Sequence, residues 1–247
     1  MMAEQVSDIA LTAGVILQEN GAETYRIGTT VSAICQSYGF TAESSVISDE
    51  ILLVVTQPRQ EKFMSIKKAK HKHIDLYRIE LVNTFSRQLK GNSLSYEEAK
   101  NELKAIEESS DFSLPVRTMA ACMTGFIYTL FFGGSLWEGF VSVAVCLVTY
   151  LIIQKFSCFE IQFLKFYLSG LTIGSISILC NILIPTVNEQ TIITGSIMIL
   201  LPGVALTNGV KDIIYGYFSS GISKLCEALL IITAVGAGVG TILLIRK

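Results

Sequence analysis

The second part of this chain contains very little charge. Residues 118–247 hold 6 Lys or Arg and 5 Asp or Glu, which is 11 charged residues in 130, whereas residues 1–117 hold 29 in 117. The lower figure is typical of a bundle of membrane spans, and the higher figure is typical of a domain in water. The contrast excludes one uniform soluble domain and predicts a water-exposed region followed by a membrane region.

Several motifs are also missing. The N-terminus Met1–Gln5 is acidic and has no basic segment followed by an apolar one, so no targeting peptide is expected. The sequence has no basic stripe and no basic arm interleaved with aromatic residues, so a nucleic-acid partner is not expected. No Walker A motif, H-E-x-x-H motif or supported Ser/His/Asp arrangement is present, which argues against an ATP-driven pump and a membrane enzyme. No cofactor is implied.

Cysteine and histidine give little sign of metal chemistry. None of the six cysteines forms a C-x-x-C pair, and we expect free, buried thiols at Cys35, Cys122, Cys146, Cys158, Cys180 and Cys226. The two histidines, His71 and His73, lie in a lysine-rich run, with no cysteine or acidic residue beside them. A solvated turn or a patch facing lipid headgroups is therefore favoured over a metal site.

The water-exposed region alternates between helical and strand periodicity. Apolar spacing predicts helices over residues 4–19 and 22–38, each ended by glycine. Short β-branched segments then predict three strands, at 45–48, 51–56 and 63–66.

The helical period returns after these strands. Residues 74–90 form one predicted helix, and Ser95 with Glu98 has the capping-box form that opens another, which runs to about residue 108. The expected fold is a small cytoplasmic α+β domain over residues 1–112.

The remainder of the chain, residues 113–247, is predicted to form an all-α bundle of about five transmembrane helices. Each apolar block is close to the ~20 residues that cross ~30 Å of hydrocarbon. The expected spans are about 118–136, 139–154, 164–184, 191–207 and 225–245.

The basic residues between these spans predict the orientation. Lys155 and Lys165 follow the second span, and Lys211 and Lys224 follow the fourth, whereas the other two loops have no Lys or Arg. The positive-inside rule places the N-terminal domain and these two loops in the cytoplasm and the C-terminus outside. Arg246-Lys247 at that end conflicts mildly with the rule. The chain is expected to be a multi-pass protein of a bacterial-type plasma membrane.

Small residues recur at four-residue spacing in two spans. Gly170 and Gly174 lie in the third span, and Gly236 and Gly240 lie in the fifth. Such faces allow close helix packing in lipid. They indicate either packing within this chain or docking to another subunit.

Polar residues within the apolar part are the candidates for transport chemistry: Asn181, Pro202, Gly203, Asn208, Asp212 and Glu227. Proline removes a backbone donor, so Pro202-Gly203 should interrupt the fourth helix and expose groups that can hold a charged substrate. Asn208 and Asp212 are four residues apart, and Asp212 could bind an ammonium group or carry a proton. The alternative is a helix end with ordinary interfacial polar residues.

Three groups of residues resemble the threonine/serine exporter family across nearly the whole chain. They are the opening motif Gly14–Arg26, the short strand Ser44–Ser48, and Leu201–Asp212 with the form P-G-x-x-L-x-N-x-x-x-D, which continues through Gly216, Ser220-Gly221 and Glu227-Ala228. The resemblance implies secondary export of small amino acids, or in some members of dicarboxylates such as succinate.

The family resemblance also implies a partner. One form of the family is split into a longer subunit, with a soluble domain and five spans, and a short all-membrane subunit. This chain resembles the longer subunit, so a second short subunit is expected; a second copy of this chain is an alternative partner. A membrane-anchored ligand-binding or regulatory protein remains the alternative function.

Residue by residue, the resemblance favours Gly21, Glu23 and Arg26 in the first motif, together with Pro202, Gly203, Asn208 and Asp212. Gly21 and Gly203 could instead serve backbone conformation alone. Glu23 and Arg26 could form an ordinary pair on a helix surface.

Overall fold

The computed structural model describes residues 1–47, 49–56, 62–70, 73–92, 94–109, 112–155 and 161–246. The chain folds into two compact units. The first comprises Met1–Ser110 and Val204–Leu225, and the second comprises Asp111–Gly203 and Cys226–Lys247. The first unit therefore includes a segment, Val204–Leu225, that lies far from the N-terminal region in the sequence.

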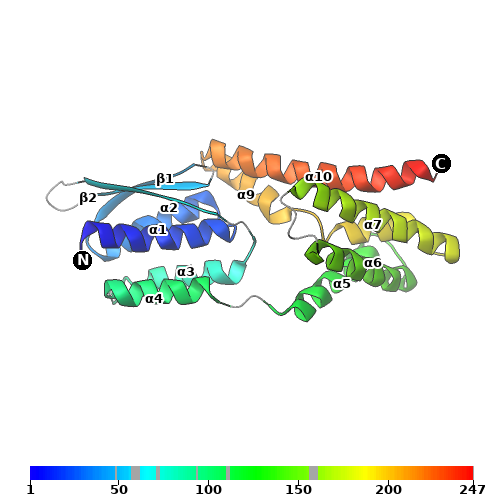
Figure 1. The fold of residues 1–247 in the computed structure, drawn as a ribbon, viewed down its shortest axis with the longest axis horizontal. Coiled ribbons are helices and arrows are strands. Elements are labelled where there is room, and N and C mark those ends of the chain that lie inside the picture. Colours follow the sequence, from blue (N-terminus) through cyan, green and yellow to red (C-terminus); the bar gives the residue numbers. More distant parts are fainter. Residues whose placement is uncertain are drawn as a thin grey trace. The chain divides into compact units, whose positions relative to one another are not determined.

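The N-terminal part of the first unit has the expected α+β fold (Figure 1). Its elements are α1 (Ala3–Glu19), α2 (Thr24–Ser37), β1 (Thr41–Ile47), β2 (Glu50–Thr56), β3 (Lys62–Lys68), α3 (Leu76–Gln88) and α4 (Tyr96–Glu107). The three strands form an antiparallel sheet in the order β1-β2-β3. The predicted Ser95–Glu98 capping box opens α4, with Ser95 Oγ accepting from the Glu98 amide.

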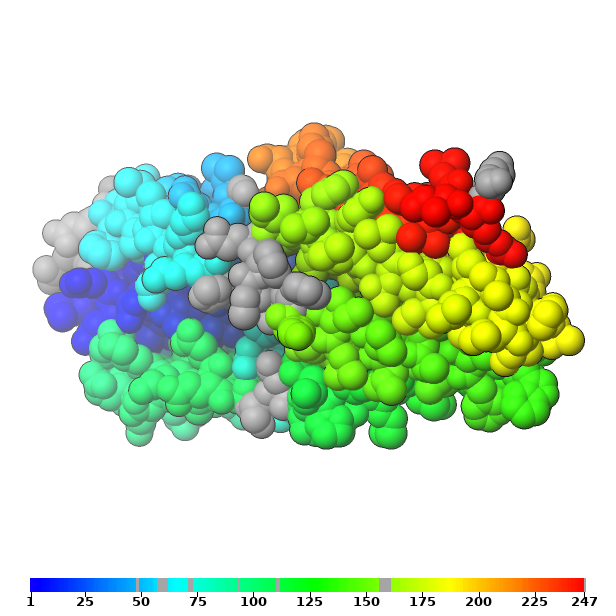
Figure 2. All heavy atoms as spheres, turned by 45° about the vertical axis from the view of Figure 1, so that its right-hand side comes forward, coloured from blue at the N-terminus to red at the C-terminus, as the bar shows by residue number. Residues whose placement is uncertain are grey.

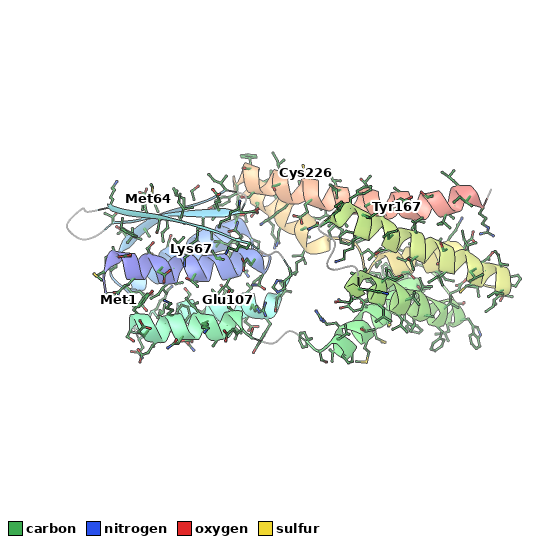
Figure 3. The ribbon with its side chains drawn as sticks, in the orientation of Figure 1. Met1, Met64, Lys67, Glu107, Tyr167 and Cys226 are labelled. Carbon is green, nitrogen blue, oxygen red and sulfur yellow. The ribbon has the colours of Figure 1, made fainter. Side chains whose placement is uncertain are left out.

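The helix α1 lies at the centre of this part. It packs against β2 and β3 on one side and against α3 and α4 on the other. Ile9, Leu11 and Leu17 are almost wholly buried, and each contributes about 1.5–3 kcal/mol by leaving water. Alternate side chains of β3 lie on opposite faces of the sheet. In Figure 3, Lys67 lies over α1 and Met64 lies on the opposite face.

The second unit is helical. Its elements are α5 (Leu114–Phe131), α6 (Leu136–Lys155), α7 (Gln162–Leu183), α8 (Glu189–Ile197) and the later part of α10 (Phe218–Ile245). Of the helices that the structure describes, α5, α6, α7 and α10 are long and apolar enough to cross a membrane. Phe131, Trp137 and Leu183 are each more than 70% exposed, as suits side chains in contact with lipid.

The predicted fourth span, residues 191–207, contains a broken helix. Here α8 ends at Ile197, a turn follows to Leu200, and α9 (Gly203–Ile214) then begins. The expected break at Pro202-Gly203 is present, but it takes up a longer stretch of chain than predicted. A proline disfavours helical backbone at the residue before it and cannot donate within a helix. With nine residues, α8 is about 13 Å long and cannot cross the bilayer alone.

Contacts at one end of the second unit give the direction of each helix. Arg246, at the end of α10, pairs with Glu189 in α8 and donates to Asn181 Oδ1 in α7 (3.0 Å). The Asn188 amide, just before α8, donates to Glu138 Oε1 in the first turn of α6 (2.6 Å). Thus α8 starts at the end of the second unit where α10 finishes, and Figure 2 shows the later part of α10 and the residues before α8 on the same side. The four long helices are candidate spans, and the predicted fourth pass of five stays a prediction.

Close helix packing in the second unit uses glycines on α7 and α10. An added Cβ on Gly170 would lie 2.4 Å from the Val235 carbonyl oxygen, and one on Gly238 would lie 2.2 Å from that of Tyr167. Gly236 and Gly240 have no atom within 4 Å of such a Cβ. The predicted Gly170 face therefore packs within the chain, whereas the glycine of α10 that meets α7 is Gly238.

The five cysteines that the structure describes are free. Cys35 and Cys146 are buried as expected, whereas Cys226 is exposed, so the expectation of burial was wrong there. Cys226 lies on α10. A thiol is nearly apolar, so it can contact lipid at the surface of a helix instead of being buried in a protein core. Cys158 and His71 lie outside the described residues.

Candidate functional site

The segment Val204–Leu225, here called the elbow, is a helical hairpin made of α9, a tight turn and the start of α10. Gly216 adopts φ +87°, a conformation that glycine accepts without strain, and the Tyr217 amide donates to the Asp212 carbonyl (2.8 Å). An added Cβ on Gly209 would lie 3.1 Å from the Gly221 carbonyl oxygen, so the two helices are in backbone contact. Gly209 belongs to the second family motif, and Gly216 and Gly221 belong to its continuation.

Within the first unit, the elbow binds the loop between α1 and α2 and the end of β1. Asn208 Nδ2 donates to the Gly21 carbonyl (2.8 Å), and Ser220 Oγ donates to the Val46 carbonyl (3.3 Å). Gly21 itself has φ +86°, so the loop turns sharply there. Both halves of the family signature therefore meet in space.

Asp212 is the centre of this contact. Its side chain is fully buried, and its two oxygens accept from the Thr24 amide (2.9 Å) and the Thr24 hydroxyl (2.7 Å). Glu23, the N-cap residue of α2, makes no side-chain cap of its own. The first turn of α2 is therefore capped by a carboxylate from another helix, where the helix dipole favours negative charge.

Lys224 neutralises Asp212. Its Nζ lies 2.7 Å from Asp212 Oδ2 and also donates to the Ala22 carbonyl (3.2 Å). The ammonium is about a quarter exposed, so one face of this ion pair reaches solvent. A buried carboxylate with a cation and two further donors is fully satisfied, and this explains how its burial is tolerated.

A second, more exposed ion pair lies beside the first. Glu23 accepts from Lys211 Nζ (3.1 Å) and pairs with Arg26 Nε (3.4 Å). Burial alone would raise the pKa of Glu23, but the Lys211 hydrogen bond, the backbone and Arg26 together hold that pKa below its ordinary value. Half of the Lys211 side chain and two-fifths of the Arg26 side chain remain exposed.

The charges at this site leave one positive charge in excess. The cations are Lys211, Lys224 and Arg26, and the carboxylates are Glu23 and Asp212. Both carboxylates are already paired with cations. The site is therefore suited to attract a further anionic group.

The structure brings together five of the candidate residues: Gly21, Glu23, Arg26, Asn208 and Asp212. Sequence reasoning did not assign Thr24 and Lys224 to the site. Thr24 adjoins the first motif, and Lys224 lies one helical hairpin beyond Asp212. Both positions could have been suspected only once the two motifs were known to meet.

The remaining candidates lie elsewhere. Asn181 donates to the Val187 carbonyl (2.7 Å) and lines an open cavity of about 260 Å³ with Arg246. Pro202 and Gly203 precede and begin α9, and Gly203 is exposed. Glu227 is half-buried on α10 and has no recorded hydrogen bond or ion pair to any described residue. No group of three metal-ligating side chains occurs among the described residues.

Comparison with known proteins agrees with the two motifs. The profile of the threonine/serine exporter family (ThrE) matches residues 8–245. A relative from Escherichia coli (strain K12), named "Probable succinate transporter subunit YjjP", is 24% identical over 253 residues, which cover 97% of this chain and 95% of the relative. No solved structure matches. The chain belongs to the threonine/serine exporter family and is a subunit of a transporter, not an enzyme.

Proposed function

We propose that this chain is the longer subunit of a two-subunit exporter, and that the elbow and the Gly21–Thr24 loop capture a carboxylate of the substrate from the cytoplasm. One observation carries the proposal: Asp212 demonstrates that a carboxylate fits between the start of α2 and a lysine. A substrate carboxylate would be held by the same kinds of donor.

The charge balance favours a dicarboxylate as the substrate. A zwitterionic amino acid needs a free carboxylate for its ammonium group, yet Glu23 and Asp212 are both paired. A dicarboxylate needs only cations and N–H groups, and Lys211 and Arg26, which share the single carboxylate of Glu23, are exposed enough to supply them. The E. coli relative's name gives succinate as its substrate. The family description supports threonine or serine as the competing substrate class.

The partner subunit is proposed from the relative's name and from the membrane region. The relative is named a transporter subunit, which implies a second component. We propose that this component is a short membrane protein supplying the other half of the transport pathway, as in the split form of the family.

The proposed orientation places the elbow in the cytoplasm. Lys155 ends α6 and Lys165 lies in the first turns of α7, at the end of the bundle opposite Arg246. Basic residues favour the cytoplasmic side. An exporter must take its substrate from that side, so a capture site on a cytoplasmic N-terminal region fits the direction of transport.

The test is efflux of labelled succinate, threonine and serine from cells that express this chain with and without the short subunit. Succinate efflux that requires both subunits is expected. Arg26→Gln and Lys211→Gln should raise the succinate concentration needed for half-maximal efflux, while Lys104→Gln, an exposed lysine on α4, should have no effect. Efflux of threonine alone, or unchanged concentration dependence in both variants, would contradict the proposed capture site.

A further inference from the structure

An open groove of about 460 Å³ lies between α5 and α6, two neighbouring helices of the second unit (Figure 1). Seven residues line it, and they include Leu114 and Met119 on α5 and Leu147 and Leu151 on α6. Both helices are candidate membrane spans, and each of these four side chains is at least 40% exposed. A groove on the exposed surface of membrane spans contacts either lipid or another protein.

The side chains that line the groove favour an acyl chain over a helix of another protein. Membrane helices approach closely through small residues, as α7 and α10 do at Gly170 and Gly238. Four of the seven residues in the groove are instead leucine or methionine, whose long side chains hold a second helix backbone away. The groove extends about 12 Å along α5, from Leu114 to Cys122, which is less than half of the ~30 Å that a transmembrane helix follows. A flexible acyl chain fits a short groove between such side chains.

One end of the groove carries a cation that has no partner among the described residues. Lys155, the last residue of α6, follows Leu151 by four residues and therefore lies on the same face of the helix. Its side chain is exposed, and no hydrogen bond or ion pair joins it to any residue that the structure describes. Leu114 begins α5 and lines the groove with Leu151, so the start of α5 lies at this end as well.

The neighbouring helices do not supply a carboxylate at this end of the groove. Neither α5 nor α7 contains an acidic residue, and those of α6 and α8, Glu138 and Glu189, lie in the first turns of their helices, at the other end of the unit. Arg117, the fourth residue of α5, adds a second cation, and its buried Nε has no hydrogen-bond partner in the described part of the chain. The end of the groove at Lys155 therefore carries positive charge that these helices do not neutralise.

An anionic phospholipid matches both the apolar lining and the charge. Its phosphate accepts charge-assisted hydrogen bonds from a lysine, while its acyl chain contacts only apolar groups. Under the proposed orientation, Lys155 lies at the cytoplasmic surface, where anionic lipids give the membrane a negative potential. We propose that the groove between α5 and α6 binds an anionic phospholipid, with an acyl chain along Leu147 and Leu151 and the phosphate on Lys155. This binding does not depend on the proposed transport function.

The test is native mass spectrometry of the purified full-length chain in detergent, with added phosphatidylglycerol or phosphatidylcholine. The two lipids carry the same acyl chains, so they differ only in the headgroup. Phosphatidylglycerol should bind about fivefold more tightly, the factor expected for one lysine beside an anionic lipid. Excess glycerol phosphate, which has the charge but no acyl chain, should not displace it.

Matched variants locate the headgroup and the acyl chain. Lys155→Gln should remove the preference for phosphatidylglycerol, whereas Lys165→Gln, which removes a cation of α7 at the same end of the unit, should keep it. Leu147→Trp should fill the groove and weaken the binding of both lipids. Val148→Trp should not, because Val148 is also 40% exposed but does not line the groove. Lys155, Leu147 and Val148 are all exposed, so these variants are expected to fold.

Three results would overturn the proposal. Equal binding of the two lipids by the parent chain would show that no anionic headgroup is recognised. An equal loss in Lys155→Gln and Lys165→Gln would show a general effect of surface charge, and an equal loss in the two tryptophan variants would place the lipid outside the groove. Loss of the bound lipid when the short membrane subunit is co-purified would instead assign the groove to a protein interface.

Discussion

At the scale of single residues, Asp212 and Thr24 are separated by 188 positions in the sequence and joined by two hydrogen bonds. A buried ion pair is weak support for stability in itself, because desolvation of two charges offsets much of their attraction. Removal of one partner is different, since it leaves the other charge buried without compensation. The Asp212–Lys224 pair should therefore be sensitive to single substitutions.

Asp212→Asn is expected to destabilise the first unit by about 3 kcal/mol, because it leaves Lys224 without a counter-ion. Lys224→Met in the same chain should restore part of this loss. The measurement is the thermal unfolding midpoint of the four chains in a double-mutant cycle. Glu23→Gln, at the more exposed pair, should cost less than 1 kcal/mol. Additive effects of the two central substitutions would show that the two side chains are not coupled.

Asp8 gives a pH-dependent contribution to stability. Burial would raise its pKa, but hydrogen bonds from Lys67 and Tyr96 hold that pKa below its ordinary value of 3.8. A lowered folded-state pKa stabilises the protein above the unfolded-state pKa, and this stabilisation is lost as the pH falls through the folded-state value.

The stability advantage of the parent chain over Asp8→Asn should therefore be constant from pH 7 to about pH 5 and disappear below the lowered pKa. It should be under about 1 kcal/mol, because the pair is partly solvated. Urea unfolding at several pH values measures it. An advantage that grew on acidification would contradict the assignment.

At the scale of elements, the close approach of α7 and α10 depends on individual glycines. Gly170 and Gly238 are in backbone contact with the opposite helix, whereas Gly240 faces open space. In lipid, helix association relies on such close contacts because apolar burial gives little net attraction between helices. The glycine spacing in the sequence identified the α7 face, but it did not distinguish Gly238 from its neighbours.

Gly238→Ala is expected to lower the unfolding midpoint by several degrees, because the added methyl group would overlap the Tyr167 carbonyl and the Leu171 amide. Gly240→Ala on the same helix should leave the midpoint unchanged or raise it, since alanine is favoured over glycine by up to about 1 kcal/mol. Differential scanning fluorimetry of the two variants in the same detergent compares them. Equal destabilisation would show that lipid exposure, not helix contact, determines the effect.

At the scale of the whole molecule, local periodicity was sufficient to predict the α+β region and the four continuous spans. Helix and strand periods are short-range signals, whereas the orientation that the basic loops indicate stays a prediction. The end of α8 at Ile197 was missed because Pro202 is the only strong breaker in that segment. The contact of the elbow with Gly21–Thr24 was missed because no local pattern reports a pairing across 188 residues.

The proposed five-pass orientation predicts the sides of the membrane on which two positions lie. In a chain with its cysteines replaced, a cysteine at Trp137, between α5 and α6, should react with a membrane-impermeant maleimide in intact cells. A cysteine at Met64 on β3 should react only after permeabilisation. Both positions are more than 60% exposed, so access to reagent is not limited by burial. Reaction of Met64 in intact cells would reverse the proposed orientation.

The membership of Val204–Leu225 in the first unit has a consequence for how these proteins can be recombined. Exchange of residues 1–110 alone between two relatives would match one parent's Thr24 and Gly21 with the other parent's Asp212, Lys224 and Asn208. A viable chimera must therefore carry two separated segments together. Substitutions in the first motif should therefore occur together with compensating substitutions in the second motif, although most of the membrane region separates the two motifs in the sequence.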